Sequence, residues 1–185
     1  FKDMTNYDLS LMHFLFGAGA EMANELGIKT EAAHWNKLKS QLPDFDLDNE
    51  GSLTFAKGFP YNASHRHFSH ALAIHPLGII DWSDGEKAQR IIRATLKKMN
   101  DYGPDYWTGY TYSWFANMQA RAFNGEEAAK ALRTFAECFC LPNTFHANGD
   151  QTNCGKSKFT YRPFTLEGNF AFASGIQEML MQSHT

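Results

Sequence analysis

Apolar side chains recur along most of this chain at the spacing of one helix face. Residues 5–26 show the pattern first, with Thr5 or Asn6 as the expected N-cap and Gly27 as the expected stop. No segment alternates apolar and polar residues convincingly over the length of a strand. The sequence therefore predicts an all-α fold of about seven helices.

Capping and breaking residues set the expected limits of the later helices. Thr30 is expected to cap a helix that ends before Pro43, and Ser83 with Glu86 is expected to form a capping box. Asn124-Gly125 turns the chain between two helices, which predicts a helical hairpin. The predicted helices after the first are residues 30–42, a His-rich helix that stops at Pro76, and residues 83–100, 108–123, 126–140 and 168–182.

Two long segments lack helical periodicity. Residues 43–63 are rich in acidic residues and glycine, and residues 141–166 are rich in asparagine and glycine. Loops of this length are uncommon in compact domains and are usually functional or disordered. The sequence therefore directs attention to side chains in or beside these loops.

The segment Ser64–Pro76 contains half of the histidines of the chain, with Arg66 among them. One interpretation is a metal site, since three of these histidines have a spacing that can converge on zinc, but the charge of Arg66 opposes a cation. A second interpretation is that the imidazoles donate hydrogen bonds to buried carbonyl groups. A third is a site for a neutral ligand, in which Arg66 and His67 donate to hydroxyl groups. The third is preferred.

Two further places are candidates for ligand contact. Tyr106 or Trp107, in a loop, is expected to be more exposed than Trp114, and either can serve as an aromatic platform; core packing is the alternative. Glu167 lies just before the last predicted helix, where a carboxylate either caps the helix or faces a cleft. Both interpretations of Glu167 stay open on local grounds.

Composition excludes several classes of partner. A net charge of −3 provides no broad cationic field, so nucleic acid and acidic membranes are not expected partners. No apolar run approaches the ~20 residues that span a bilayer. The three cysteines form an odd set, in which a Cys140–Cys154 disulfide is one option. The chain begins at Phe1 without an initiator methionine or signal peptide, and we expect it to be an excised piece.

Several motifs, in order, resemble glycoside hydrolase family 95, the inverting α-L-fucosidases and α-L-galactosidases. HRHFSHALAIHPLGII resembles the His-Arg-His-x-Ser-His segment of that family, and FTLEGNFAFASGIQEMLMQSH is similar to the stretch that closes its barrel. NYDLSLMHFLF and WTGYTYSWFANMQARAFNGEEAAKALR also resemble family segments. The resemblance covers most of the chain.

The resemblance implies a partial (α/α)6 barrel, with residues 1–185 as a single domain that forms the C-terminal half of the catalytic domain. Arg66 and His67 match the pair that binds the terminal sugar in the family, and His65 and Trp107 are added as candidate substrate contacts. Glu167 takes the place of an aspartate that polarises an asparagine, which in turn positions the attacking water. That asparagine and the general-acid glutamate have no counterpart here. No metal or other cofactor is implied.

The chain departs from the family at two places. Glu167–Ala171 reads Glu-Gly-Asn-Phe-Ala where the family usually has Asp-Gly-Asn-Phe-Gly, and Phe55-Ala56 replaces a Glu-Trp. We therefore expect part of an exo-acting α-glycosidase that is inactive in isolation. The alternative is a non-catalytic carbohydrate-binding or structural helical domain.

The expected partners are a glycan or oligosaccharide substrate and the rest of the parent polypeptide. Self-association of the fragment is also expected, because half a toroid leaves apolar helix faces uncovered. A secreted or periplasmic location is favoured if the parent degrades glycans.

Overall fold

The computed structural model describes residues 4–181, and this part of the chain is all-α, as the sequence predicts. It contains no β-strand within those residues, only isolated β-bridges. Six α-helices are connected by loops and by two 3-10 helices, Ser69–Ala71 (η1) and Trp82–Asp84 (η2). The α-helices are Asn6–Glu25 (α1), Lys29–Ser40 (α2), Glu86–Tyr102 (α3), Gly109–Arg121 (α4), Gly125–Cys138 (α5) and Glu167–Met181 (α6).

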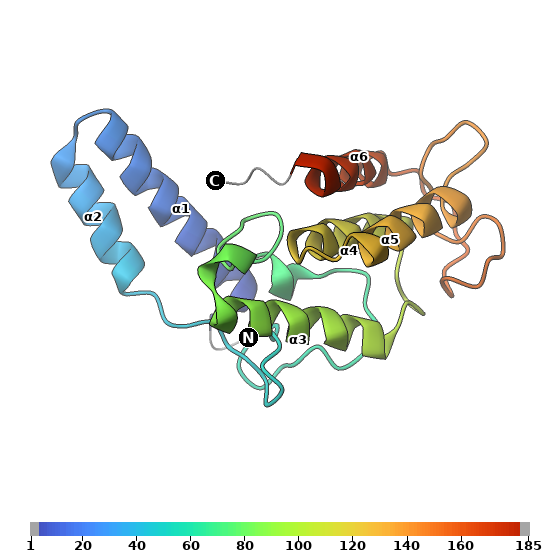
Figure 1. Ribbon diagram of the computed structural model, residues 1–185, viewed down its shortest axis with the longest axis horizontal. Coiled ribbons are helices and arrows are strands. Elements are labelled where there is room, and N and C mark those ends of the chain that lie inside the picture. The colour runs from blue at the N-terminus through green and yellow to red at the C-terminus, as the bar shows by residue number, and fades with distance from the viewer. Residues whose placement is uncertain (1–3, 182–185) are drawn as a thin grey trace.

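The main helix–helix contacts join α1 to α2 and join α4 to both α5 and α6 (Figure 1). α1 and α2 form a hairpin that projects to one side. α4 is the most enclosed of these helices, with buried side chains around most of its circumference. Such pairing is consistent with a fragment of an (α/α) toroid.

Helix ends follow the local sequence at some places and not at others. Thr5 caps α1 as expected, accepting a hydrogen bond from the Asp8 N–H at 3.1 Å. The caps expected at Thr30 and Ser83 are wrong, because Thr30 lies inside α2 and Ser83 lies inside η2. Gly85 precedes α3 instead, with a positive φ that favours glycine.

The predicted His-rich helix that stops at Pro76 is also wrong. The segment contains only the single 3-10 turn η1 and a run of turns. Residues 65–67 are exposed, whereas Phe68, His70, Ala71, Ala73 and Ile74 are buried, so the second part of the segment passes through the core. Tertiary packing, rather than the periodicity of one apolar face, sets its path.

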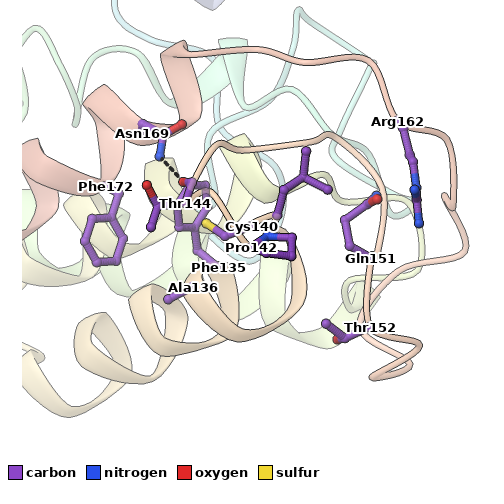
Figure 2. A pocket seen from close by; sticks show the side chains of 11 residues that line it. Phe135, Ala136, Cys140, Pro142, Thr144, Gln151, Thr152, Arg162, Asn169 and Phe172 are labelled. Atoms are coloured by element: carbon purple, nitrogen blue, oxygen red, sulfur yellow. Dashed lines mark hydrogen bonds between the residues drawn. The ribbon is translucent and has the colours of Figure 1, made fainter.

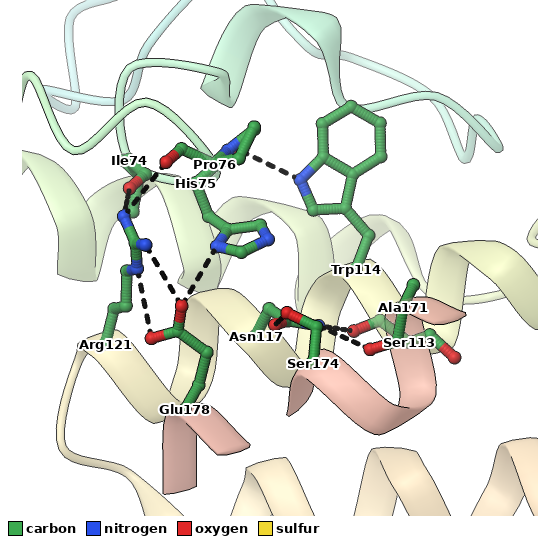
Figure 3. A network of polar contacts seen from close by, with 10 residues as sticks. All are labelled: Ile74, His75, Pro76, Ser113, Trp114, Asn117, Arg121, Ala171, Ser174 and Glu178. Atoms are coloured by element: carbon green, nitrogen blue, oxygen red, sulfur yellow. Dashed lines mark hydrogen bonds and ion pairs between the residues drawn. The ribbon is translucent and has the colours of Figure 1, made fainter. Parts of the chain in front are cut away.

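Polar contacts fix α6 against α4 (Figure 3). The Arg121 guanidinium donates two hydrogen bonds to the Glu178 carboxylate, at 3.2 and 3.0 Å, and both side chains are only 12% exposed. Arg121 also donates to the carbonyl of Ile74, at 3.1 Å. Nearer the start of α6, Ser174 donates to the Asn117 side chain at 2.8 Å. These contacts hold the middle and the second half of α6 against α4.

The cysteine pairing differs from the expected option. Cys138, at the end of α5, forms the disulfide with Cys154, and Cys140 is free. Cys138 is buried and close to the second long loop, whereas Cys140 has already left the helix. Within residues 4–181, no helix combines the length and the hydropathy needed to cross a bilayer.

Candidate functional site

Arg66, His67 and Glu167 lie in the wall of one pocket, although about a hundred residues separate the first two from the third. The pocket has a volume of about 340 Å³. The structure therefore brings together three of the five site residues expected from the sequence. The complete lining is Arg66, His67, Thr108, Tyr110, Asn148, Thr165 and Glu167.

The backbone beside Arg66 is held against the N-terminus of α4. The Thr111 hydroxyl donates to the Arg66 carbonyl at 2.7 Å and accepts from the Thr108 N–H at 3.0 Å. Two residues earlier, the Ser64 hydroxyl accepts from the Tyr106 N–H at 2.9 Å. The Arg66 guanidinium lies 5.8 Å from the centroid of the Phe159 ring. Arg66 thus has a fixed backbone and an exposed cationic end, which suits hydrogen bonding to a ligand.

His67 is exposed at the surface of the pocket, and its surroundings favour the neutral ring. Burial of part of the ring lowers its pKa, and the positive charge of Arg66 lowers the pKa further. A neutral imidazole has one donor and one acceptor nitrogen. His67 can therefore exchange hydrogen bonds in both directions with a hydroxyl-rich ligand near neutral pH.

Glu167 is the first residue of α6, and its side chain is exposed. A carboxylate in the first turn of a helix interacts favourably with the positive end of the helix dipole. The Tyr110 hydroxyl shares the pocket, and its pKa is raised by burial and by the negative charge of Glu167. Tyr110 therefore remains a neutral hydrogen-bond donor beside the carboxylate.

Two other candidates lie outside the pocket lining. Trp107 is only 3% exposed, with its ring packed against Phe68 and Phe115, so the core interpretation applies to it and Tyr106 is the exposed member of the pair. In this structure Trp107 is part of the core and does not line the candidate pocket. His65 is exposed, but its Nδ1 accepts a hydrogen bond from the His67 N–H at 3.1 Å. His65 therefore supports the local turn.

The four histidines of the segment do not converge. The His70 ring is buried among the rings of Phe55 and Tyr61, while Nδ1 of His75 lies 4.0 Å from Glu178. Across residues 4–181, no group of three or more His, Cys, Asp or Glu side chains is arranged to hold a metal ion. The geometry gives no support to the metal-site interpretation.

Four lining residues are not among the site residues expected from the sequence: Thr108, Tyr110, Asn148 and Thr165. Asn148 and Thr165 belong to the second long loop, where no periodic pattern distinguishes one polar side chain from another. Thr108 carried a detectable signal, because threonine before a glycine is a reasonable N-cap and helix N-termini often face ligands.

A larger cavity, of about 770 Å³, is formed by α5, α6 and the second loop (Figure 2). The Phe135 and Phe172 rings contribute apolar surface, and Asn169 donates to the Thr144 carbonyl at 2.9 Å on its rim. None of the site residues expected from the sequence lines this cavity. The smaller pocket is therefore the candidate site, because it has the convergent charged and polar groups.

The sequence of this chain is similar to those of known glycoside hydrolases. A family model described as the glycosyl hydrolase family 95 catalytic domain matches residues 1–180. The chain is also similar to alpha-L-fucosidase 2 of Arabidopsis thaliana, with 30% identity over 184 residues. This alignment covers 96% of the chain and 21% of the relative, so the chain spans about a fifth of the length of that protein.

Proposed function

This chain belongs to glycosyl hydrolase family 95, and from that premise we propose that it forms part of an exo-acting inverting α-glycosidase. The proposed substrates are glycans or oligosaccharides that end in α-L-fucose or an α-L-galactose-type sugar. The observation that carries the proposal is the shared pocket of Arg66, His67 and Glu167. We further propose that residues 1–185 form one domain within a longer polypeptide.

In this proposal, Arg66 and His67 hold the terminal sugar. The planar guanidinium can donate two parallel hydrogen bonds to neighbouring sugar oxygens. The neutral ring of His67 can donate to one hydroxyl and accept from another. Charged and neutral donors on one wall suit a polyhydroxylated, uncharged ligand better than an anion, because the Glu167 carboxylate faces the same space.

Glu167 acts on the side from which water attacks. Water adds to the anomeric carbon as the bond to the leaving oxygen breaks, and that oxygen takes a proton from a carboxylic acid. The water loses its proton on the Glu167 side, through a group that Glu167 polarises. In inverting enzymes the two catalytic groups lie roughly 6.5–9.5 Å apart to admit the water. We assign the acid and the polarised group to the rest of the polypeptide.

The glutamate at position 167 distinguishes this chain from the usual family pattern. Its extra methylene moves the carboxylate relative to an aspartate, and a displacement of about 1 Å can reduce a rate on the order of a hundredfold. A carbohydrate-binding domain that has lost its catalytic function is therefore the second candidate. Both candidates require the pocket to bind a sugar, and they differ in turnover by the longer polypeptide.

The first test is titration of the 185-residue chain with methyl α-L-fucoside and methyl α-L-galactoside, followed by NMR. Saturable shifts are expected at Arg66, Tyr110 and Glu167. His67→Ala should weaken binding about tenfold, the effect of losing one or two hydrogen bonds in a partly exposed site. His34→Ala, which removes an exposed histidine on α2, is the matched control and should bind as the parent does.

Turnover separates the two candidates. The isolated chain should not hydrolyse an aryl α-L-fucoside or α-L-galactoside, since the proton donor is assigned elsewhere. Release of the aryl group by the chain alone would contradict that assignment. Sugar binding by the chain without hydrolysis by the longer polypeptide would support the carbohydrate-binding candidate instead.

We also propose that the isolated chain self-associates. Leu15 and Met22 on α1 and Phe170 and Leu180 on α6 are all more than half exposed, although they are large and apolar. Exposed apolar helix faces favour contact with another surface. Sedimentation at increasing concentration should show a rise in mass, and a monomer at all concentrations would contradict the proposal.

A further inference from the structure

The imidazole of His146 is inserted between the first turns of α4 and α6. A Cβ atom placed on Gly168 would lie 2.4 Å from Nδ1 of this ring, and one placed on Gly109 would lie 2.4 Å from Nε2. Both distances are far shorter than any van der Waals contact. The ring therefore occupies the space that a side chain at either glycine would need, and it lies in contact with both helix starts.

Hydrogen bonds determine which nitrogen of His146 carries the proton. Nδ1 lies 2.7 Å from the Thr165 carbonyl oxygen and 2.8 Å from the Thr165 hydroxyl. A carbonyl oxygen can only accept, so Nδ1 bears the hydrogen and Nε2 bears a lone pair. Nε2 is buried and has no hydrogen-bond partner among the residues that the structure describes. Burial lowers the pKa of this imidazole, which keeps the ring neutral.

Most residues that line the candidate pocket are close neighbours of a residue in contact with this ring. Thr108 and Tyr110 flank Gly109, and Glu167 directly precedes Gly168. The Thr165 hydroxyl, in contact with Nδ1, also donates to the Asn148 side chain at 3.0 Å. Five of the seven residues that line the pocket therefore depend on where the His146 ring lies.

The ring itself is firmly held from behind. The His146 side chain is fully buried and stacks on the Phe135 ring, with centroids 5.2 Å apart. Its backbone N–H donates to the Asn169 side chain at 2.9 Å, which connects it to α6 a second time. The ring is thus a rigid spacer and has no exposed surface for direct ligand contact.

We infer that His146 is a positioning residue for the sugar pocket. Its neutral imidazole, with the proton on Nδ1, sets the spacing between the starts of α4 and α6 and so holds Glu167 and Tyr110 opposite Arg66 and His67. The inference rests on the proposed function, since it gives that pocket its shape. It assigns His146 no contact with substrate.

The first experiment needs no sugar. Two-dimensional ¹⁵N NMR of the histidine rings at pH 8 should show His146 as a neutral imidazole with the proton on Nδ1. The amide signals of Tyr110 and Glu167 should both shift in Gly168→Ala. Gly125→Ala, at the first residue of α5, is the matched control, because a Cβ there meets nothing within 4 Å. A proton on Nε2, or unchanged pocket signals in Gly168→Ala, would overturn the inference.

The second experiment separates positioning from packing. His146→Asn places an N–H close to the position of Nδ1, whereas His146→Leu retains bulk without a donor. Affinity for methyl α-L-fucoside should fall at least tenfold in His146→Leu and about threefold in His146→Asn, even if Asn lowers the melting temperature more. A purely structural role predicts that affinity follows melting temperature in both variants.

An error in the proposed function and an error in the role of His146 would give different results in these experiments. If the parent chain binds no methyl fucoside while the ring tautomer and the pocket shifts are as expected, the sugar assignment is wrong and the spacing role stands. If the parent binds and His146→Leu binds equally well in a folded state, the positioning role is wrong and the sugar assignment stands. Combining Gly168→Ala with His146→Ala should cost less stability than the sum of the single changes, because the double variant relieves the overlap.

Discussion

Two long loops bring the pocket residues together, and they are held in different ways. The first loop, residues 43–68, is fixed by buried aromatic rings and by an ion pair between Asp48 and Lys98 of α3. The second loop, residues 139–166, is fixed by the Cys138–Cys154 disulfide and by backbone N–H groups that donate to Asp150. The two walls of the pocket should therefore respond to different perturbations. Removal of a charge should perturb the first loop, and reduction of the disulfide should perturb the second.

Reduction of the disulfide should have the largest effect. The Cys138–Cys154 bond closes a loop of 16 residues, and a cross-link of that length contributes about 3 kcal/mol to the free energy of unfolding. Replacing both cysteines with alanine should lower the free energy of unfolding by that amount. Hydrogen exchange should increase in residues 139–166 and stay unchanged in residues 43–68.

Cys140→Ala is the matched control for this prediction, because Cys140 is the free thiol two residues from Cys138. Reductant should lower the stability of Cys140→Ala by the same amount as that of the parent. Equal increases of hydrogen exchange in both loops after reduction would mean that the two loops are not held independently.

Loss of Lys98 should perturb the first loop with a somewhat smaller effect. The Lys98 ammonium contacts Asp48 and lies 3.4 Å from Glu50, and it is only 11% exposed. Lys98→Ala leaves the Asp48 carboxylate with its backbone donors alone, which should cost about 2 kcal/mol. Lys97→Ala is the adjacent control, since Lys97 pairs with Asp101 in solvent and should show no measurable change in urea unfolding.

The ease of prediction from sequence also differs between regular and irregular regions. Helical periodicity and breaking residues located α1 to α6 to within a few residues, because each of these helices buries part of its surface. The same pattern gave a wrong prediction for the His-rich segment. Phe68, His70 and Ile74 are buried there on several sides, which produces helix-like apolar spacing without a helix. The spacing of apolar residues shows which side chains are buried, and both helices and irregular segments can bury side chains at that spacing.

The pocket was predictable only in part for a related reason. Arg66, His67 and Glu167 stand out as charged or ring side chains in recognisable motifs, and the structure brings them together. Asn148 and Thr165 lie in a loop full of similar residues, and His146 acts through contacts with two glycines that are distant in sequence. The pairing of Cys138 rather than Cys140 likewise depends on where the second loop folds back.

Acidification should lower the free energy of unfolding by about 1 kcal/mol through His70, which lies in η1 directly after the first loop. The His70 ring is buried among aromatic rings, its nitrogens have no hydrogen-bond partner among the described residues, and burial lowers its pKa from 6.5 to about 3. The unfolded chain binds this proton below pH 6.5 and the folded chain does not. Stability is therefore complete above pH 6.5 and falls as the pH drops, by about 1 kcal/mol between pH 7 and pH 5.5.

His70→Leu tests this acid dependence directly. Leucine has a volume close to that of histidine and does not titrate, so the variant should lose that part of the pH dependence while keeping its stability at pH 7. Urea unfolding at pH 7 and pH 5.5 measures both quantities. An unchanged pH slope in the variant would show that His70 is not the group responsible.

The smallest expected effect lies where the two loops touch. The Arg66 guanidinium of the first loop lies 5.8 Å from the Phe159 ring centroid of the second, near the outer limit of a cation–π contact. A double-mutant cycle of Arg66→Met and Phe159→Leu should give a coupling free energy of about 0.5 kcal/mol. The Arg93–Trp82 pair, at 4.8 Å, is an internal reference and should couple more strongly. Because the walls are anchored separately, a coupling between Arg66 and Phe159 larger than that reference would mean that each loop depends on the other for its position.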